Sequence, residues 1–150
     1  MNEQENNVSF FRFEDLRIYA KAMDYIVWLY GEFADVPSSN REVDCLKESF
    51  LNAAQEIALH TAEGSSRNKT QFLYYLKMAK SSVRECVVFT EIATRRDLFT
   101  KESKEYSRNQ LMELTKMIGS LIASLQRSNA TAREEHEDDF DMQLPSLDDL

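Results

Sequence analysis

Residues 16 to 34 place an apolar side chain at alternating steps of four and three positions: Leu16, Ala20, Met23, Val27, Tyr30 and Ala34. This spacing keeps all six side chains on one face of an α-helix, and it is typical of the seam along which helices pack in a bundle. With three glycines and two prolines in 150 residues, few positions would interrupt long helices. The chain is therefore predicted to be all-α.

Three further stretches repeat the helical spacing. A second helix is predicted to start at Ser39, as an N-cap with Glu42 as its capping-box partner, and to stop at Gly64 in a left-handed conformation. A third is predicted from an Asn68 cap and a fourth from near Thr100. The apolar positions of these helices are Leu46, Phe50, Ala53 and Ile57; Phe72, Leu76, Ala79, Val83, Cys86 and Ala93; and Leu111, Leu114, Ile118, Leu121 and Leu125.

The linkers between these helices are short, which favours antiparallel neighbours. The sequence thus predicts an up-down-up-down antiparallel four-helix bundle over residues 10–128. Residues 129–150 contain eight acidic residues, one basic residue and a proline, without a sustained apolar period. They are predicted to form a disordered acidic tail.

The net charge of −8 is concentrated outside the predicted bundle. Residues 9–128 hold 17 basic and 16 acidic side chains. Since the bundle itself is close to neutral, the acidity of the whole chain does not exclude RNA or DNA as a partner.

The chain shows neither a secretory signal pattern nor an apolar run long enough to cross a membrane, so we expect a cytoplasmic protein without a membrane partner. Cys45 and Cys86 each lie in an apolar helical pattern. Both are expected to be free, buried thiols, because a reducing compartment disfavours a disulfide.

The stretch "HTAEGSSR" at 60–67 combines side chains that occur in catalytic and metal sites. Glu56, His60 and Glu63 would share one helical face, but a ferritin-like metal bundle needs further histidine and glutamate ligands that this sequence does not supply in the required pattern. Ser65 and Ser66 are better interpreted as turn and cap residues. We therefore expect no catalytic residue, no metal site and no cofactor, with a metal-binding bundle enzyme as the least favoured alternative.

The same stretch is interpreted as a structural corner between the second and third helices. Gly64 would provide the left-handed turn. Glu63 lies near the negative end of its helix, so it is expected to pair with Arg67 or to face the start of the third helix.

Two surface features suggest binding partners. The second and third helices carry apolar residues over a wider arc than one bundle core is expected to cover, which predicts a homo-oligomer that uses these two helices. The third helix and the residues before it also carry a set of basic side chains that could contact phosphates of RNA or DNA. These are Arg67, Lys69, Lys77, Lys80, Arg84 and Arg95.

The acidic tail interleaves apolar side chains with its carboxylates: Phe140, Met142, Leu144, Leu147 and Leu150. It either keeps the protein in solution or acts as a short motif that docks on a basic groove of its own chain or of a basic protein partner.

Three segments together resemble the bacterial 23S rRNA intervening-sequence proteins: "FEDLRIYAKAMDYIVWLY", "AEGSSRNKTQFLYYLKMAKSSVRE" and the leucine-rich fourth helix. The family motif Asn-Ile-Ala-Glu-Gly-x-x-Arg aligns with residues 60–67, where His60 and Thr61 replace its first two residues. The resemblance implies a four-helix bundle that assembles as a homopentamer without an assigned activity. A related branch, the accessory variability protein of diversity-generating retroelements, binds nucleic acid and a reverse transcriptase.

The sequence therefore favours a non-enzymatic, oligomeric binding or scaffold protein with RNA or DNA as a candidate ligand. The alternative is a protein interaction hub that uses the acidic tail.

Overall fold

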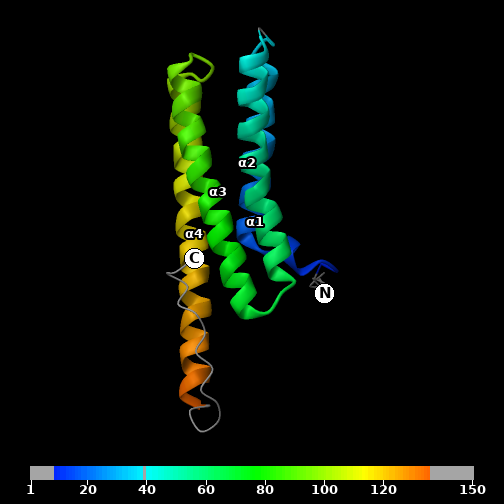
Figure 1. The fold of residues 1–150 in the computed structure, drawn as a ribbon, viewed down its shortest axis with the longest axis vertical. Coiled ribbons are helices and arrows are strands. Elements are labelled where there is room, and N and C mark those ends of the chain that lie inside the picture. Colours follow the sequence, from blue (N-terminus) through cyan, green and yellow to red (C-terminus); the bar gives the residue numbers. More distant parts are fainter. Residues whose placement is uncertain (1–8, 39, 136–150) are drawn as a thin grey trace, which may run out of the picture.

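The computed structural model describes residues 9–38 and 40–135, and within this part the chain is helical without strands. A short 3-10 helix, η1, precedes four α-helices. Their bounds are η1 Arg12–Asp15, α1 Arg17–Ala34, α2 Arg41–Ser65, α3 Lys69–Arg95 and α4 Lys101–Glu135. Consecutive helices run in opposite directions, and α4 also packs on α1, so the four helices enclose one core (Figure 1). The predicted all-α, up-down-up-down bundle is confirmed.

Side-chain caps define where the helices begin. Asn68 caps α3 as expected, since its Oδ1 accepts a hydrogen bond from the Gln71 backbone N–H at 2.9 Å. Thr100 likewise accepts from the Ser103 backbone N–H at 3.1 Å, at the start of α4. The predicted Ser39 cap is wrong, because Asn40 caps α2 through the Val43 backbone N–H at 2.9 Å. Asparagine and serine cap helices about equally well, so residue preference alone does not choose between adjacent positions.

The core face of α1 differs from the predicted one. Except for the half-buried Leu16, the seam residues Ala20, Met23, Val27, Tyr30 and Ala34 are exposed. The buried face holds Ile18, Ala22, Tyr25, Ile26, Leu29 and Phe33. Both sets follow a helical spacing, so periodicity alone could not decide which one enters the core. A regular apolar seam is thus left on the outside of the chain.

The bundle core covers most of the apolar surplus that was expected on α2 and α3. Of the α2 residues behind that expectation, Phe50, Ala54 and Ile57 are fully buried and Leu51 is half-buried, but Leu59 is 64% exposed. The α3 residues behind it are all buried or half-buried: Phe72, Leu73, Tyr75, Leu76, Val83, Cys86, Val87 and Phe89. The expectation of surplus apolar surface therefore holds for Leu59 and is wrong for the other residues.

The fourth helix is longer than predicted. It continues to Glu135, seven residues beyond the predicted end of the bundle at position 128. Alanine, arginine and glutamate favour helix, and they outweigh the repulsion expected between the acidic residues. The rest of the predicted tail, residues 136–150, lies outside the described residues. Among the described helices, none has an apolar stretch that could cross a bilayer.

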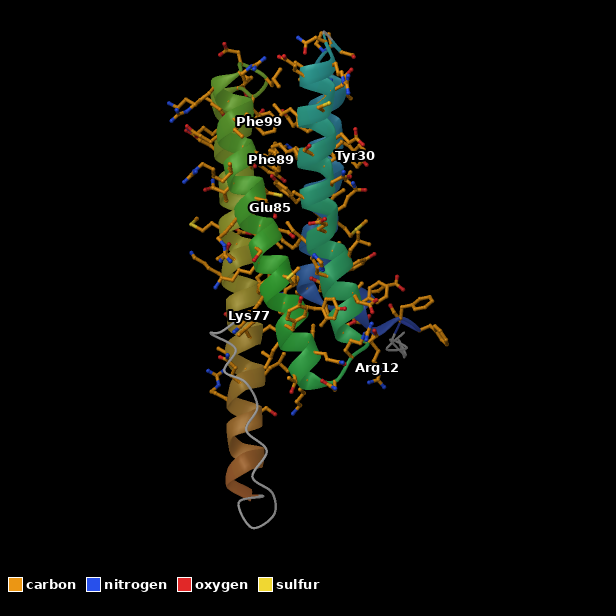
Figure 2. The ribbon with its side chains drawn as sticks, in the orientation of Figure 1. Arg12, Tyr30, Lys77, Glu85, Phe89 and Phe99 are labelled. Atoms are coloured by element: carbon orange, nitrogen blue, oxygen red, sulfur yellow. The ribbon has the colours of Figure 1, made fainter. Side chains whose placement is uncertain are left out.

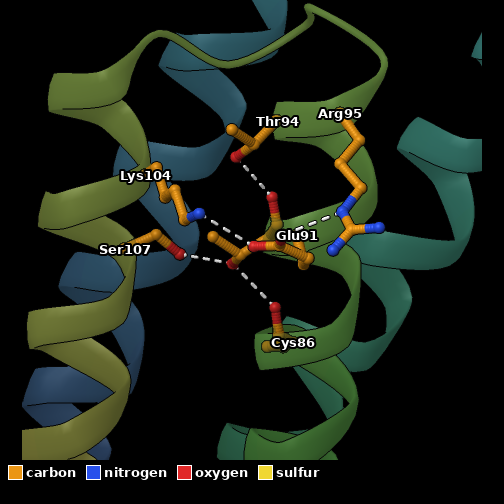
Figure 3. Close-up of polar contacts among 7 residues, drawn as sticks. Cys86, Glu91, Thr94, Arg95, Lys104 and Ser107 are labelled. Atoms are coloured by element: carbon orange, nitrogen blue, oxygen red, sulfur yellow. Dashed lines mark hydrogen bonds and ion pairs between the residues drawn. The ribbon is translucent and has the colours of Figure 1, made fainter.

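A chain of buried hydroxyl groups links three helices in the core. The Tyr25 hydroxyl of α1 lies 2.8 Å from Ser107 Oγ of α4. Ser107 Oγ in turn lies 2.7 Å from Thr90 Oγ1 of α3, which donates to the Cys86 carbonyl oxygen at 2.7 Å (Figure 3). Burial raises the pKa of the Tyr25 phenol above its usual range, so this group stays protonated.

The two cysteines have different environments. Cys86 is buried near this hydroxyl chain, and burial raises the pKa of its thiol. Cys45 is exposed on α2, so the prediction that both thiols are buried is wrong for Cys45. Both are free, as predicted.

We predict that Ser107→Ala lowers the free energy of unfolding by about 1–3 kcal/mol, because it leaves the buried Tyr25 hydroxyl without its partner. Urea denaturation followed by circular dichroism measures this change. Adding Tyr25→Phe to the variant removes the unsatisfied hydroxyl and should recover part of the loss. The coupling is contradicted if Tyr25→Phe lowers the free energy of unfolding of the Ser107→Ala variant by as much as it lowers that of the native protein.

Candidate nucleic-acid interface

Gly64 brings α2 and α3 close together near their connection. It is buried inside α2 and has an ordinary helical conformation, so the predicted left-handed turn is wrong. A Cβ atom at this position would lie 2.6 Å from Tyr75 Cβ and 2.9 Å from Phe72 Cδ2. The glycine is therefore required because it has no side chain where the two helices touch, and not because of backbone freedom.

The expected Glu63–Arg67 ion pair closes this corner. Arg67 Nε donates to Glu63 Oε1 at 3.0 Å, and Arg67 Nη2 donates to the same oxygen. The guanidinium also lies 5.8 Å from the centre of the Tyr75 ring. The charge of Arg67 is thus held at the corner, next to the negative end of α2.

The candidate metal ligands on α2 have other partners. Glu56 accepts a hydrogen bond from Ser82 Oγ at 3.4 Å, and Glu63 pairs with Arg67. The His60 ring lies beside Tyr75, with 6.2 Å between ring centres. In the part of the chain that the structure describes, no three His, Cys, Asp or Glu side chains form a group that could hold a metal ion.

Three of the six candidate phosphate-binding residues share one face of α3. Lys77, Lys80 and Arg84 are three and four residues apart, so their side chains follow one another along the helix. We call this set the basic stripe. Arg84 is exposed, whereas Lys77 and Lys80 are half-buried. Lys77 lies on the side of α3 that is next to α4 in the view of Figure 2.

The other candidates have separate contacts at the two ends of α3. Lys69 Nζ donates to Ser128 Oγ of α4 at 2.6 Å. At the opposite end, Arg95 Nε contacts Glu91 Oε1 at 3.0 Å, and Lys104 Nζ of α4 contacts Glu91 Oε2 at 2.9 Å (Figure 3). The hydrogen bonds from Lys104 and Arg95 hold the pKa of Glu91 below its usual value. Glu91, which lies on the same side of α3 as the stripe, is thus neutralised by two cations.

Two apolar surfaces remain exposed. The first, which we call the seam face, consists of Met23, Val27, Tyr30 and Leu59, of which Val27 is 65% and Leu59 64% exposed. Helices α1 and α2 meet at the seam face, because Met23 of α1 and Leu59 of α2 line one hollow and the Tyr30 hydroxyl of α1 donates to Gln55 Oε1 of α2. The second, the α3 face, consists of Tyr74, Met78, Val88 and Ile92.

Sequence reasoning identified Leu59 as surplus apolar surface but did not predict that the other residues of the two faces are exposed. It assigned the α1 seam to the core of its own chain. On α3 it used neighbouring positions that the core covers. The α1 part of the seam face could have been found from its strict helical spacing, which also fits a surface that packs on another subunit. The α3 face could have been found from apolar residues that recur on the side of α3 away from the core.

Comparisons with known proteins agree with the fold. A family described as "23S rRNA-intervening sequence protein" matches residues 14–120. A crystal structure of a protein with unknown function from the S23 ribosomal protein family of Bacteroides thetaiotaomicron superposes with a TM-score of 0.62 at 18% identity, covering 71% of this chain and 95% of that chain. This similarity shows the fold. No curated protein matches the sequence.

We predict that Gly64→Ala lowers the free energy of unfolding by about 1–3 kcal/mol, because the new methyl group pushes α3 away from α2. Chemical denaturation measures this change. Gly119→Ala is the matched control, since a Cβ at Gly119 meets nothing within 4 Å. The control should raise stability by about 0.5–1 kcal/mol through helix propensity. Equal stabilisation by both variants would show that the close approach at Gly64 is not needed.

Proposed function

This chain belongs to the 23S rRNA-intervening sequence protein family, and we propose that it is a non-enzymatic, homo-oligomeric scaffold whose basic stripes bind the phosphate backbone of RNA or DNA. The observation that carries the proposal is the exposed apolar seam of α1. Its strict spacing is that of helices packed on a partner, yet its own bundle leaves most of it exposed, with Val27 65% exposed. A second copy of the chain would cover it.

The seam face and the α3 face differ in position and composition, so one subunit can present its seam face to the α3 face of the next. A contact between two different surfaces is heterologous, and it closes into a ring when the rotation between subunits permits. We propose five subunits, the number that the family resemblance implies. Such an assembly would remove the exposed apolar side chains from water, which is the main source of favourable free energy in association.

The basic stripe supports the nucleic-acid part of the proposal. Its three cations follow one another on α3, and in a ring they would recur once per subunit. The potentials of repeated stripes add, which strengthens attraction for a polyanion. Residues 9–128 are nearly neutral, so the bundle offers little opposing charge. Contacts to phosphates would release counterions and make affinity depend on salt.

We predict that native mass spectrometry of the full chain records the mass of five subunits and that Val27→Glu yields single 17.5 kDa chains. The charge would have to be buried without a partner in the interface, whereas in the isolated subunit it stays in water. Circular dichroism should show unchanged helix content.

Met112→Glu is the matched control for this experiment, because Met112 is also an exposed apolar residue but lies on α4, outside both faces. It should leave the oligomer intact. A single-chain mass for the native protein at micromolar concentration would overturn the assembly.

We predict that the full chain binds a fluorescein-labelled RNA hairpin at ~50 mM salt and that Lys80→Glu with Arg84→Glu weakens binding at least ~tenfold. Fluorescence anisotropy at several salt concentrations measures affinity and its salt dependence. For every phosphate that the variant no longer neutralises, the slope of log K against log salt should become shallower by about 0.7–0.9. A DNA hairpin of the same sequence separates preference for RNA from general phosphate binding.

Arg41→Glu changes the charge by the same amount per site at the start of α2, away from the basic stripe, and should have little effect. Absence of binding to both hairpins at this salt concentration would refute nucleic-acid binding. The double variant changes the charge by −4 and Arg41→Glu by −2, so a control that gives half the double variant's change in log K would show that only total charge matters.

A further inference from the structure

A hollow of about 480 Å³ lies between the start of α1 and the middle of α4, and it is open to solvent. Its apolar part is formed by Leu16 and Ile18 from the α1 side and by Met117 and Leu121 from α4. Leu16, Met117 and Leu121 are only half-buried. The hollow therefore leaves apolar surface in contact with water, which an apolar side chain could cover.

The polar rim of the hollow favours carboxylates. Arg17 and Lys116 are exposed at this rim, together with one acidic residue, Asp15. Leu16, the N-cap residue of α1, offers no side-chain hydrogen bond to the first turn, and among the described residues this turn contains no acidic side chain. The free backbone N–H groups of this turn add partial positive charge on the same side.

The described chain ends close enough for its own continuation to reach the hollow. The Lys69–Ser128 hydrogen bond places Ser128 beside the start of α3, and α4 then continues to Glu135. Ser120, at the hollow, is fifteen residues before Glu135, which corresponds to about 22 Å along the helix. An extended chain covers this distance in about seven residues. With a few residues for the reversal, residues 142–147 arrive at the hollow.

We propose that residues 136–150 fold back along α4 and dock in this hollow. Met142, Leu144 and Leu147 are the apolar side chains within reach, and they cover the exposed parts of Leu16, Met117 and Leu121. Of the acidic residues in this segment, Asp148 and Asp149 are far enough along the chain to face Arg17, Lys116 and the first turn of α1. The segment thus supplies apolar side chains for the exposed apolar lining and carboxylates for the two cations at the rim.

The docking site is separate from the basic stripe, because the hollow lies on the α1–α4 side of the bundle and the stripe lies on α3. It also leaves the seam face and the α3 face free. The acidic segment therefore has a binding place in its own subunit rather than acting only as a source of negative charge.

The test is carbodiimide cross-linking of the full chain without nucleic acid, followed by peptide mass spectrometry. This reagent joins carboxylates to lysine amines that are in direct contact. We expect cross-links between Lys116 and the carboxylates of Asp148 and Asp149. Lys101 is the matched control, because it is an exposed lysine of the same helix but lies about 50 Å from Glu135, well past the hollow in which the segment docks.

Replacing Met142, Leu144 and Leu147 together by Gln keeps every charge and removes the apolar contacts. The Lys116 cross-links should fall at least ~threefold, and the backbone amides of residues 17–20 should exchange with deuterium at least ~threefold faster. When ¹⁴N-labelled and ¹⁵N-labelled chains are mixed before cross-linking, the two peptides of each cross-linked pair should carry the same isotope, because both come from one subunit.

Cross-links to Lys101 as frequent as those to Lys116 would overturn the docking. Unchanged cross-linking and exchange in the Gln variant would do the same. Cross-links between isotopes would overturn the assignment to the same subunit. Since no hairpin is present, a failure to bind RNA or DNA leaves these results unaffected.

Discussion

The hydrogen bond between Tyr25 and Ser107 ties the first helix to α4 at its observed rotation. α1 has two apolar faces about 130° apart, and the buried one has the larger side chains, among them Ile18, Leu29 and Phe33. At this rotation the buried phenol has a partner, Ser107, which is itself bonded to Thr90. A buried hydroxyl without a partner costs about 1–3 kcal/mol, so this contact adds a polar constraint to apolar burial. Together they leave the second apolar face outside, where another subunit could bind.

This dependence explains why the helices were predictable from the sequence and the rotation of α1 was not. Periodicity and capping residues are local signals, and they placed Asn68 and Thr100 correctly at helix starts. The choice between two apolar faces of one helix depends on side chains that are 65 and 82 positions away, in α3 and α4. Gly64 presents the same difficulty. A glycine near a helix end has the same sequence signature whether it turns the chain or admits a neighbouring helix.

The candidate interface was predictable as a set of residue types but not as a surface. Helical spacing correctly groups Lys77, Lys80 and Arg84. The pairing of Arg67 with Glu63 was also expected from the sequence. The contact of Lys69 with Ser128 was not, because it depends on how α4 packs against α3. Similarly, Glu91 interrupts the basic positions in the sequence, yet Lys104 from α4 and Arg95 both contact it. The local charge of this surface is thus a property of two helices together.

The extension of α4 past the other helices gives each subunit a direction. In Figure 1 the lower part of α4 projects below the turn that joins α2 and α3, and the other end of the bundle carries only the two remaining turns. Subunits related by a single rotation axis all point the same way along that axis. A ring of these subunits would therefore be polar, with all α4 ends on one side and two different rims. Any molecule that approaches along the axis would meet different chemistry from each side.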